Sequence, residues 1–156
     1  MTNQEISRRL QVLNDLVSKT SNACRNDPEI LAHWAKYLCI LHSGLLETAI
    51  QQLFSDFTKR AASTPVVNHV QLTLSSIQNP KAAKFIEVAR SFKKSWGDRL
   101  EDFMGQDGRK DAIDSIMHNR HQIAHGRYSG LSMAQLKEYV AKEVAVLEFI
   151  EGLLHT

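Results

Sequence analysis

An arginine and a histidine lie five residues apart near the end of the chain, in the segment Asn119–Gly126, which reads NRHQIAHG. Arg120 carries a permanent planar cation that binds phosphate oxygens through a rigid fork of donors. His125 titrates near neutral pH and can take up or release a proton during a reaction. Together, these two side chains could hold a phosphodiester and move the protons needed to cleave it without a metal ion.

The residues around this pair follow a helical pattern over Arg109–Ala124, with apolar side chains on one side. The polar side carries three histidines spaced three and four residues apart, namely His118, His121 and His125. Arg120 and His125 are separated by about 140° around an ideal helix at ~100° per residue. The two side chains would not converge in a perfect helix, but unwinding at Ala124–Gly126 would let His125 swing toward Arg120.

The same histidines could also be metal ligands. The stretch from His121 to His125 differs by one residue from the H-E-x-x-H pattern of zinc enzymes, and His118 adds a third imidazole. Gln122 cannot act as the general base that glutamate supplies in those enzymes, and no further ligand is evident after His125. The sequence therefore predicts no metal site and no cofactor.

Helical signals also dominate the first half of the chain, and no strand-like alternation persists. Thr2-x-x-Glu5 predicts a capping box that opens a helix to about Thr20. Asp27-Pro28 predicts the start of a long helix that ends near Arg60. The same type of start signal recurs at Thr64-Pro65 and predicts a short third helix.

Asn79-Pro80 predicts the start of a fourth helix that runs to about Trp96 and stops at Gly97. The elements expected after it are a short turn or helix over Asp98–Met104, a loop over Gly105–Gly108, the helix Arg109–Ala124, and a last helix capped by Ser132-x-x-Gln135. The sequence therefore predicts an all-α bundle of about five to seven helices, forming one domain over residues 1–156.

Composition bounds the class of protein. The chain has 156 residues, is 43% hydrophobic and has a net charge of +2, so it can bury a core but has no strong overall attraction for nucleic acid. Cys24 and Cys39 are too few for a disulfide framework and indicate reduced thiols. No leader or membrane-spanning segment is evident, so we expect a cytoplasmic protein with no membrane partner.

Two further features each admit two interpretations. Glu47, in the middle of the long helix, either pairs with a surface cation or reaches the site and orients Arg120 or a histidine. The stretch Pro80–Arg99 is rich in lysine and arginine, which indicates either a solvated face or a track for an RNA backbone.

The segment NRHQIAHG resembles the R-x4-6-H signature of the HEPN superfamily, with His121 at the position after the arginine that is often polar. The similarity is greatest to the RiboL-PSP-type HEPN group and covers most of the chain. Four flanking stretches resemble that group in the same order, namely Tyr37–Glu47, Trp96–Phe103, Asp111–Ile116 and Ser132–Tyr139. The resemblance implies a HEPN-like helical domain from a group in which many members are metal-independent endoribonucleases.

The resemblance also implies roles for individual residues. His125 would be the general base for a ribose 2′-hydroxyl or the acid for the leaving oxygen, and Arg120 would hold the scissile phosphate. His121 would position the substrate or tune His125. The candidates for substrate binding or for support of these groups are His118, Asn119, Arg127 and Glu47. The products would be a 2′,3′-cyclic phosphate and a 5′-hydroxyl.

The resemblance further implies a homodimer in which two R-x4-H segments face one RNA across a shared cleft. Its setting would be a toxin–antitoxin pair or antiviral defence, with an antitoxin or sensor protein as a possible partner. Some HEPN toxins carry H-x-Tyr after the motif, whereas Tyr128 stands one place later here. The alternative is an inactive HEPN-like module that binds nucleotides or RNA or mediates dimerisation. The intact Arg120/His125 pair favours the enzyme.

Overall fold

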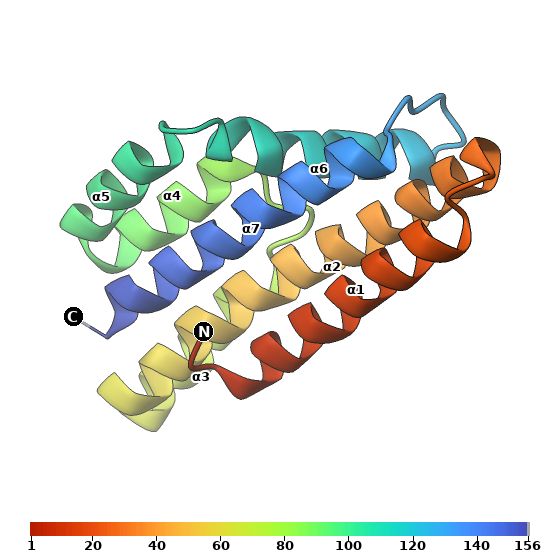
Figure 1. The fold of residues 1–156 in the computed structure, drawn as a ribbon. Coiled ribbons are helices and arrows are strands. Elements are labelled where there is room, and N and C mark those ends of the chain that lie inside the picture. Colours follow the sequence, from red (N-terminus) through yellow and green to blue (C-terminus); the bar gives the residue numbers. More distant parts are fainter. Residues whose placement is uncertain (156) are drawn as a thin grey trace.

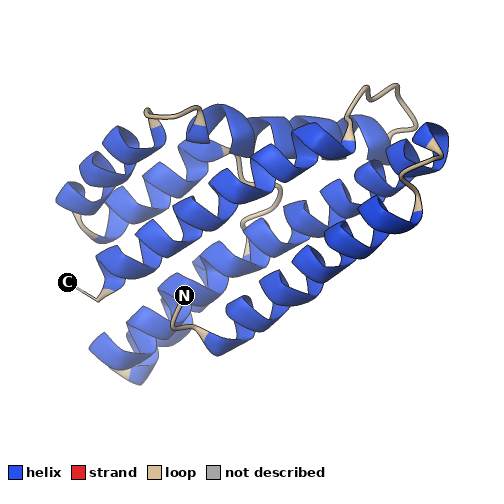
Figure 2. Ribbon diagram, in the orientation of Figure 1, coloured by secondary structure: helices blue, strands red, loops and turns tan. Residues whose placement is uncertain are grey.

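The computed structural model describes residues 1–155, which form seven helices and no strand (Figures 1 and 2). The helices are α1 Gln4–Ala23, α2 Pro28–Ala61, α3 Thr64–Ser75, α4 Ala82–Phe92, α5 Lys94–Met104, α6 Arg109–Ala124 and α7 Met133–Leu154. In the bundle, α2 lies against α1, α6 and α7, and α6 also lies against α7. The predicted all-α fold is confirmed.

A continuous apolar core runs through the bundle and takes side chains from all seven helices. Its largest fully buried members include Phe54 of α2, Phe85 of α4 and Leu136 of α7. Helix α3 contributes only Leu74 to the buried side chains and packs mainly on α2. The core therefore fixes α6 firmly between α2 and α7, whereas α3 extends from the end of α2 (Figure 1).

The sequence signals for the start of α2 and of α7 are confirmed. The Asp27 carboxylate accepts a hydrogen bond from the Ile30 N–H at 3.1 Å. Ser132 and Gln135 form the predicted capping box at the start of α7. These local contacts satisfy backbone donors that a helix start leaves unpaired.

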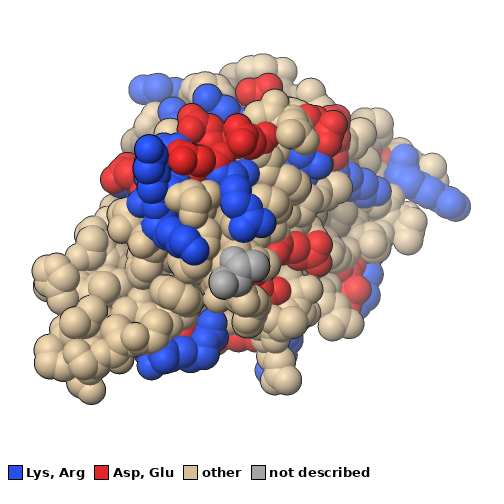
Figure 3. Space-filling model, turned by 90° about the vertical axis from the view of Figure 1, so that its left-hand side faces the viewer, with Lys and Arg blue, Asp and Glu red and all other residues tan. Residues whose placement is uncertain are grey.

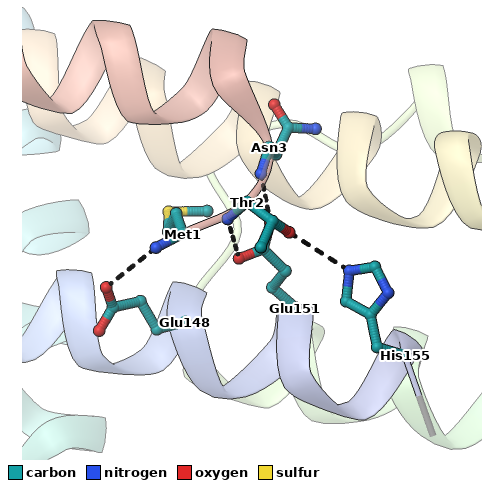
Figure 4. A network of polar contacts seen from close by, with 6 residues as sticks. All are labelled: Met1, Thr2, Asn3, Glu148, Glu151 and His155. Carbon is teal, nitrogen blue, oxygen red and sulfur yellow. Dashed lines mark hydrogen bonds and ion pairs between the residues drawn. The ribbon is translucent and has the colours of Figure 1, made fainter.

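The first helix is capped differently from the prediction. Asn3, not Thr2, is the N-cap, and its side chain accepts from the Ile6 N–H at 3.1 Å. The backbone N–H groups of Thr2 and Asn3 instead donate to the Glu151 carboxylate of α7, at 2.7 and 2.6 Å (Figure 4). A buried carboxylate is a stronger acceptor than a local side chain, so a distant residue overrides the local signal.

Glu151→Gln should make the fold less sensitive to acid. Burial raises the pKa of Glu151, but the hydrogen bonds from the backbone N–H groups of Thr2 and Asn3 outweigh it, and the net pKa is lowered. The stability that the carboxylate contributes is therefore present above the pKa of the unfolded chain and lost as pH falls through the folded value. Denaturant unfolding between about pH 6 and pH 3 should show a steeper loss of stability for the wild type than for the variant. Identical slopes would contradict this assignment.

The prediction of a fourth helix that runs to Trp96 and stops at Gly97 is wrong. Helix α4 ends at Phe92, Lys93 is extended (φ −155°, ψ 124°), and Gly97 lies inside α5. A Cβ atom at position 97 would lie 2.3 Å from the Cβ of Arg90. The glycine therefore permits close packing of α4 on α5 and does not end a helix. The start of α4 is also later than predicted, at Ala82, whose N–H donates to Asp114 Oδ1 of α6 at 2.8 Å.

Two of the six basic side chains in the stretch Pro80–Arg99 are paired with acidic side chains. Arg90 lies 3.1 Å from Asp98 and 2.6 Å from Glu101, and Lys84 lies 2.9 Å from Glu87. Figure 3 shows basic and acidic side chains side by side at this end of the molecule. For Arg90 and Lys84 the structure therefore favours the interpretation as a solvated face over an RNA-backbone track.

No helix in residues 1–155 combines the length and apolarity needed to cross a bilayer.

Candidate active site at the end of helix α6

Helix α6 ends in a glycine motif immediately after the R-x4-H segment. His125 is the C-cap residue, and Gly126 adopts a left-handed conformation with φ 65°. The Gly126 N–H donates to the Ile123 carbonyl at 3.1 Å, and the Arg127 N–H donates to the Gln122 carbonyl at 2.9 Å. This pair of bonds is the Schellman arrangement, in which glycine avoids the strain that a side chain would cause. The predicted end of the helix is confirmed.

His125 is held against His121 of the preceding turn. The two ring centroids lie 4.4 Å apart with an interplanar angle of 56°, and both residues are exposed. Unwinding of the helix at Ala124–Gly126 would have let His125 swing toward Arg120. Instead the backbone of His125 stays close to helical (φ −97°, ψ 13°), because the two Schellman bonds close the last turn around it. The structure therefore pairs the two imidazoles with each other.

Arg120 is half-buried beside α2. The sulfur of Cys39 on α2 lies beside the backbone of α6, with its thiol donating to the Ile116 carbonyl at 3.5 Å. Burial and nearby Glu143 raise the pKa of Cys39 to about 12, although the backbone N–H of Arg120 lowers it. Within residues 1–155 no hydrogen bond or ion pair engages the guanidinium of Arg120. Its donors are therefore available to an anion.

The stretch of chain that contains the R-x4-H segment carries no acidic residue. Between Ser115 and Lys137 the chain has no aspartate or glutamate, but it contains two arginines and three histidines. Arg127, the second of these arginines, is exposed, and like Arg120 it has no acidic partner in the described part of the chain. This end of α6 is suited to bind an anion such as a phosphate.

His121 should titrate below the ordinary range of histidine. Its pKa is lowered by partial desolvation and by the neighbouring charges of His125, Arg127, Arg120 and His118. Of the sequence candidates, these four therefore lie close enough to His121 to influence it. A lowered pKa keeps this imidazole neutral near pH 7, the form that accepts a proton. NMR titration of the histidine Cε1–H signals should place His121 below about 6.5, and Arg127→Ala should raise the value. An unchanged value in that variant would show that Arg127 does not face the site.

Asn119 anchors the loop that follows the helix. Its side-chain oxygen accepts from the Ser129 hydroxyl at 2.8 Å, and its amide donates to the Ser115 carbonyl at 2.9 Å. Ser129 is buried, so this contact fixes residues 125–132, the α6–α7 loop, beside the end of α6. From the sequence, Asn119 is a candidate for substrate binding or support, and the structure uses its polar atoms for support. Ser129 was not predicted, because an isolated serine in a loop gives no periodic signal.

Glu47 lies away from the R-x4-H segment. It follows Cys39, which contacts α6 beneath Arg120, by eight residues, a distance of about 12 Å along α2. Its carboxylate accepts from the Asn79 N–H at 2.6 Å. Asn79 has a positive φ of 47°, so the contact stabilises a strained turn before α4. Of the two interpretations, the structure supports neither a surface ion pair nor the orientation of Arg120, and shows a backbone contact instead.

His118 completes the exposed row of histidines one turn before Gln122, with its Nε2 3.5 Å from the Gln122 amide nitrogen. Nevertheless, residues 1–155 contain no group of three or more His, Cys, Asp or Glu side chains arranged to hold a metal ion. The alternative interpretation of these histidines as a zinc site therefore has no complete ligand set in the described chain.

A buried ion pair beneath α6 was not found from the sequence. His42 Nδ1 of α2 lies 2.8 Å from Glu143 Oε2 of α7, and neither side chain is exposed. His42 Nε2 and Glu143 Oε1 have no hydrogen-bond partner. Both residues occupy apolar-face positions of their helices, and a polar residue at such a position is the signal that could have identified them.

By its fold and this site, the protein is a small all-α domain that presents a cation and imidazoles at the end of a helix. The model of the RiboL-PSP-HEPN family matches residues 3–155, and the chain belongs to this family. The resemblance seen in the sequence is thereby confirmed, and membership supports an RNA-related role. No curated protein and no solved structure matches the chain.

Proposed function

We propose that this protein is a metal-independent endoribonuclease with its active site at the end of α6. The observation that carries the proposal is the unpaired Arg120 guanidinium close to two contacting imidazoles, His121 and His125, in a stretch of chain without an acidic residue. A helical adaptor has no need for an unpaired half-buried cation beside a neutral imidazole. A phosphodiester supplies the negative charge that these groups lack.

The proposed reaction uses the ribose 2′-hydroxyl as the nucleophile. An imidazole takes the 2′-hydroxyl proton while the 2′-oxygen forms a bond to phosphorus. The bond from phosphorus to the 5′-oxygen breaks, and a protonated imidazole donates to this leaving oxygen. The products are a 2′,3′-cyclic phosphate and a 5′-hydroxyl. Arg120 binds the phosphate oxygens and stabilises the charge that develops on them.

The geometry of the two imidazoles argues for a homodimer. Attacking and leaving oxygens lie roughly in line on opposite sides of phosphorus, so base and acid must approach from opposite sides. His121 and His125 of one chain have centroids only 4.4 Å apart, which leaves no room for a phosphate between them. A second copy related by a two-fold axis would supply the imidazole on the far side. We therefore propose a composite active site with one R-x4-H segment from each copy.

The setting that fits such an enzyme is a toxin–antitoxin pair or antiviral defence in the cytoplasm. The RNA would be the substrate, and an antitoxin or sensor protein would control access to it. Support for this setting comes from the family alone.

The direct test is incubation of the purified protein with RNA in the presence of EDTA. Cleavage should continue, and it should stop at any linkage whose 2′-hydroxyl is replaced by hydrogen, because that linkage has no nucleophile. Analysis of the ends should show a cyclic phosphate and a 5′-hydroxyl. Cleavage abolished by EDTA, or cleavage of the 2′-deoxy linkage, would refute the mechanism. RNA binding without cleavage would favour the non-catalytic module.

Mixing the wild type with one variant tests the composite site. Wild type and His125→Ala protein, unfolded together in equal amounts and refolded, should give about one half mixed dimers and about one quarter of each pure dimer. If both histidines act on one phosphate, only the wild-type dimers cleave, and activity per total dimer should fall to about one quarter of the pure wild type. Independent sites would leave about one half. A mass measurement of each sample confirms the dimer.

A further inference from the structure

Tyr128 is an aromatic residue that the fold holds in solvent. It lies in the α6–α7 loop and is 88% exposed, the highest exposure of any large apolar or aromatic residue in the described chain. The loop is nevertheless fixed on both sides of this residue. The Arg127 N–H is bonded to the carbonyl of Gln122, and the Ser129 hydroxyl is bonded to Asn119.

The ring rests against a glycine. A Cβ atom added at Gly130 would lie 3.3 Å from the Tyr128 hydroxyl oxygen and 3.5 Å from Cε1. The glycine therefore leaves space for the ring beside the loop backbone, and a larger residue would crowd it. The tyrosine is positioned by its surroundings, and most of its ring surface still faces water. A single exposed aromatic residue is ordinary on a protein surface, so the case for a role rests on the groups that accompany Tyr128.

The chemistry around the ring points to an unpaired base. Tyr128 is the third residue after His125, so their Cα atoms are at most about 10 Å apart. The residues that adjoin Tyr128 in the chain are arginine, histidine and serine, and no acidic residue occurs from Ser115 to Lys137. An aromatic ring beside unpaired cations matches what single-stranded nucleic acid offers, namely a flat base next to a phosphate.

We propose that Tyr128 is a stacking platform for an unpaired base next to the phosphate bound by Arg120, which makes single-stranded RNA the substrate. This inference rests on the proposed function and deepens it. A base in a duplex is stacked between its neighbours and cannot lie on the tyrosine ring, so a paired segment would bind without this contact. The hydroxyl group of Tyr128 has no part in stacking, and phenylalanine or tryptophan should therefore replace it.

The experiment measures binding separately from cleavage. The host is the His125→Ala protein, which leaves the RNA intact, and the probe is a short single-stranded RNA that carries the fluorescent base 2-aminopurine. Tyr128→Ala, Tyr128→Phe and Tyr128→Trp are compared in this host. The matched control is Leu72→Ala, because Leu72 of α3 is 73% exposed and lies outside the site. The same RNA annealed to its complement serves as the duplex probe.

Tyr128→Ala should weaken binding of the single strand by about five- to a hundredfold and abolish quenching of 2-aminopurine. The Phe and Trp variants and the Leu72 control should keep the single-strand affinity and the quenching. The affinity of Tyr128→Ala for the duplex should not change. Equal affinity in Tyr128→Ala and its host would overturn the stacking proposal and leave the nuclease proposal intact. Loss of binding in the Phe variant would show that the hydroxyl matters and would also overturn it. If Tyr128→Ala instead dissociates the dimer, the ring is a subunit contact and the proposal fails.

Absence of RNA binding by the host and the wild type alike would overturn both proposals together. In the otherwise unchanged protein, Tyr128→Ala should raise the KM for single-stranded RNA more than it lowers kcat, because stacking contributes to binding before the chemical step.

Discussion

Alanine at position 125 should lower the rate of RNA cleavage by about 10²–10⁴-fold, because general acid–base catalysis contributes that much in enzymes. His125 is exposed and contacts only its neighbour His121 among ring partners, so the fold should not change. The rate is measured with a labelled RNA under single-turnover conditions. His69→Ala on α3 is the matched control, because it removes another exposed histidine far from α6.

Variants of Arg120 test phosphate binding separately from proton transfer. Arg120→Ala should reduce cleavage by about 10²–10³-fold, the effect of removing one charge-stabilising donor group in an active site. Arg120→Lys keeps the charge but loses the fork of donors, so its activity should lie between the alanine variant and the wild type. If Arg120→Ala and His125→Ala both cleave as fast as the His69 control, the site lies elsewhere and the proposed function is wrong.

Replacing His42 by leucine should lower the free energy of unfolding by about 3–5 kcal/mol, the effect of removing one partner of a buried ion pair. The variant leaves Glu143 fully buried with neither carboxylate oxygen bonded to His42. The loss is measured by denaturant unfolding. The double variant with His42→Leu and Glu143→Met should recover most of the stability, because apolar groups of similar volume need no partner.

The stability of the His42→Leu variant should depend on pH because of the Glu143 carboxyl group. Burial raises the pKa of Glu143, and in the wild type the interaction with His42 opposes this effect. Without His42, the folded state must keep Glu143 protonated at pH values where the unfolded chain has released the proton. The carboxyl group then favours the folded state only below its unfolded pKa, and this stability is lost as pH rises. Unfolding of His42→Leu should be easiest near pH 7 and hardest near about pH 4, relative to the wild type. A pH-independent difference would show that Glu143 stays neutral in both proteins.

Local signals in the sequence are sufficient to predict most of the helices. Asp27-Pro28, Ser132-x-x-Gln135 and Gly126 each act within one turn of their own helix, and each lies where the pattern places it. The errors occur where a distant residue supplies the decisive contact. Glu151 takes the backbone donors at the first helix, and Arg90 approaches so closely that Gly97 is a packing residue. A single sequence does not reveal such long-range pairs.

In the candidate site too, features set by local spacing could be predicted from the sequence, and features set by distant residues could not. Helical spacing correctly places His118, His121 and His125 on one exposed side, because the period of the helix alone determines it. The direction of His125 was not predictable, because it depends on how the two Schellman bonds close the last turn. The support provided by Ser129 and by the His42–Glu143 pair depends on packing between helices, which no spacing within one helix encodes.

The contacts between the start of the chain and helix α7 matter when the protein is attached to a bead or a chip. Met1 bonds to Glu148 and Thr2 to Glu151, so the start of the chain lies on the last helix (Figure 4). Figure 1 shows this junction toward one end of the bundle and the α6–α7 loop at the other. A linker attached after the last helix would orient the loop outward and leave the amino group of Met1 free to contact Glu148. A linker attached at Met1 would replace the charged amino group that Glu148 binds, so immobilisation through the carboxyl end is the better choice.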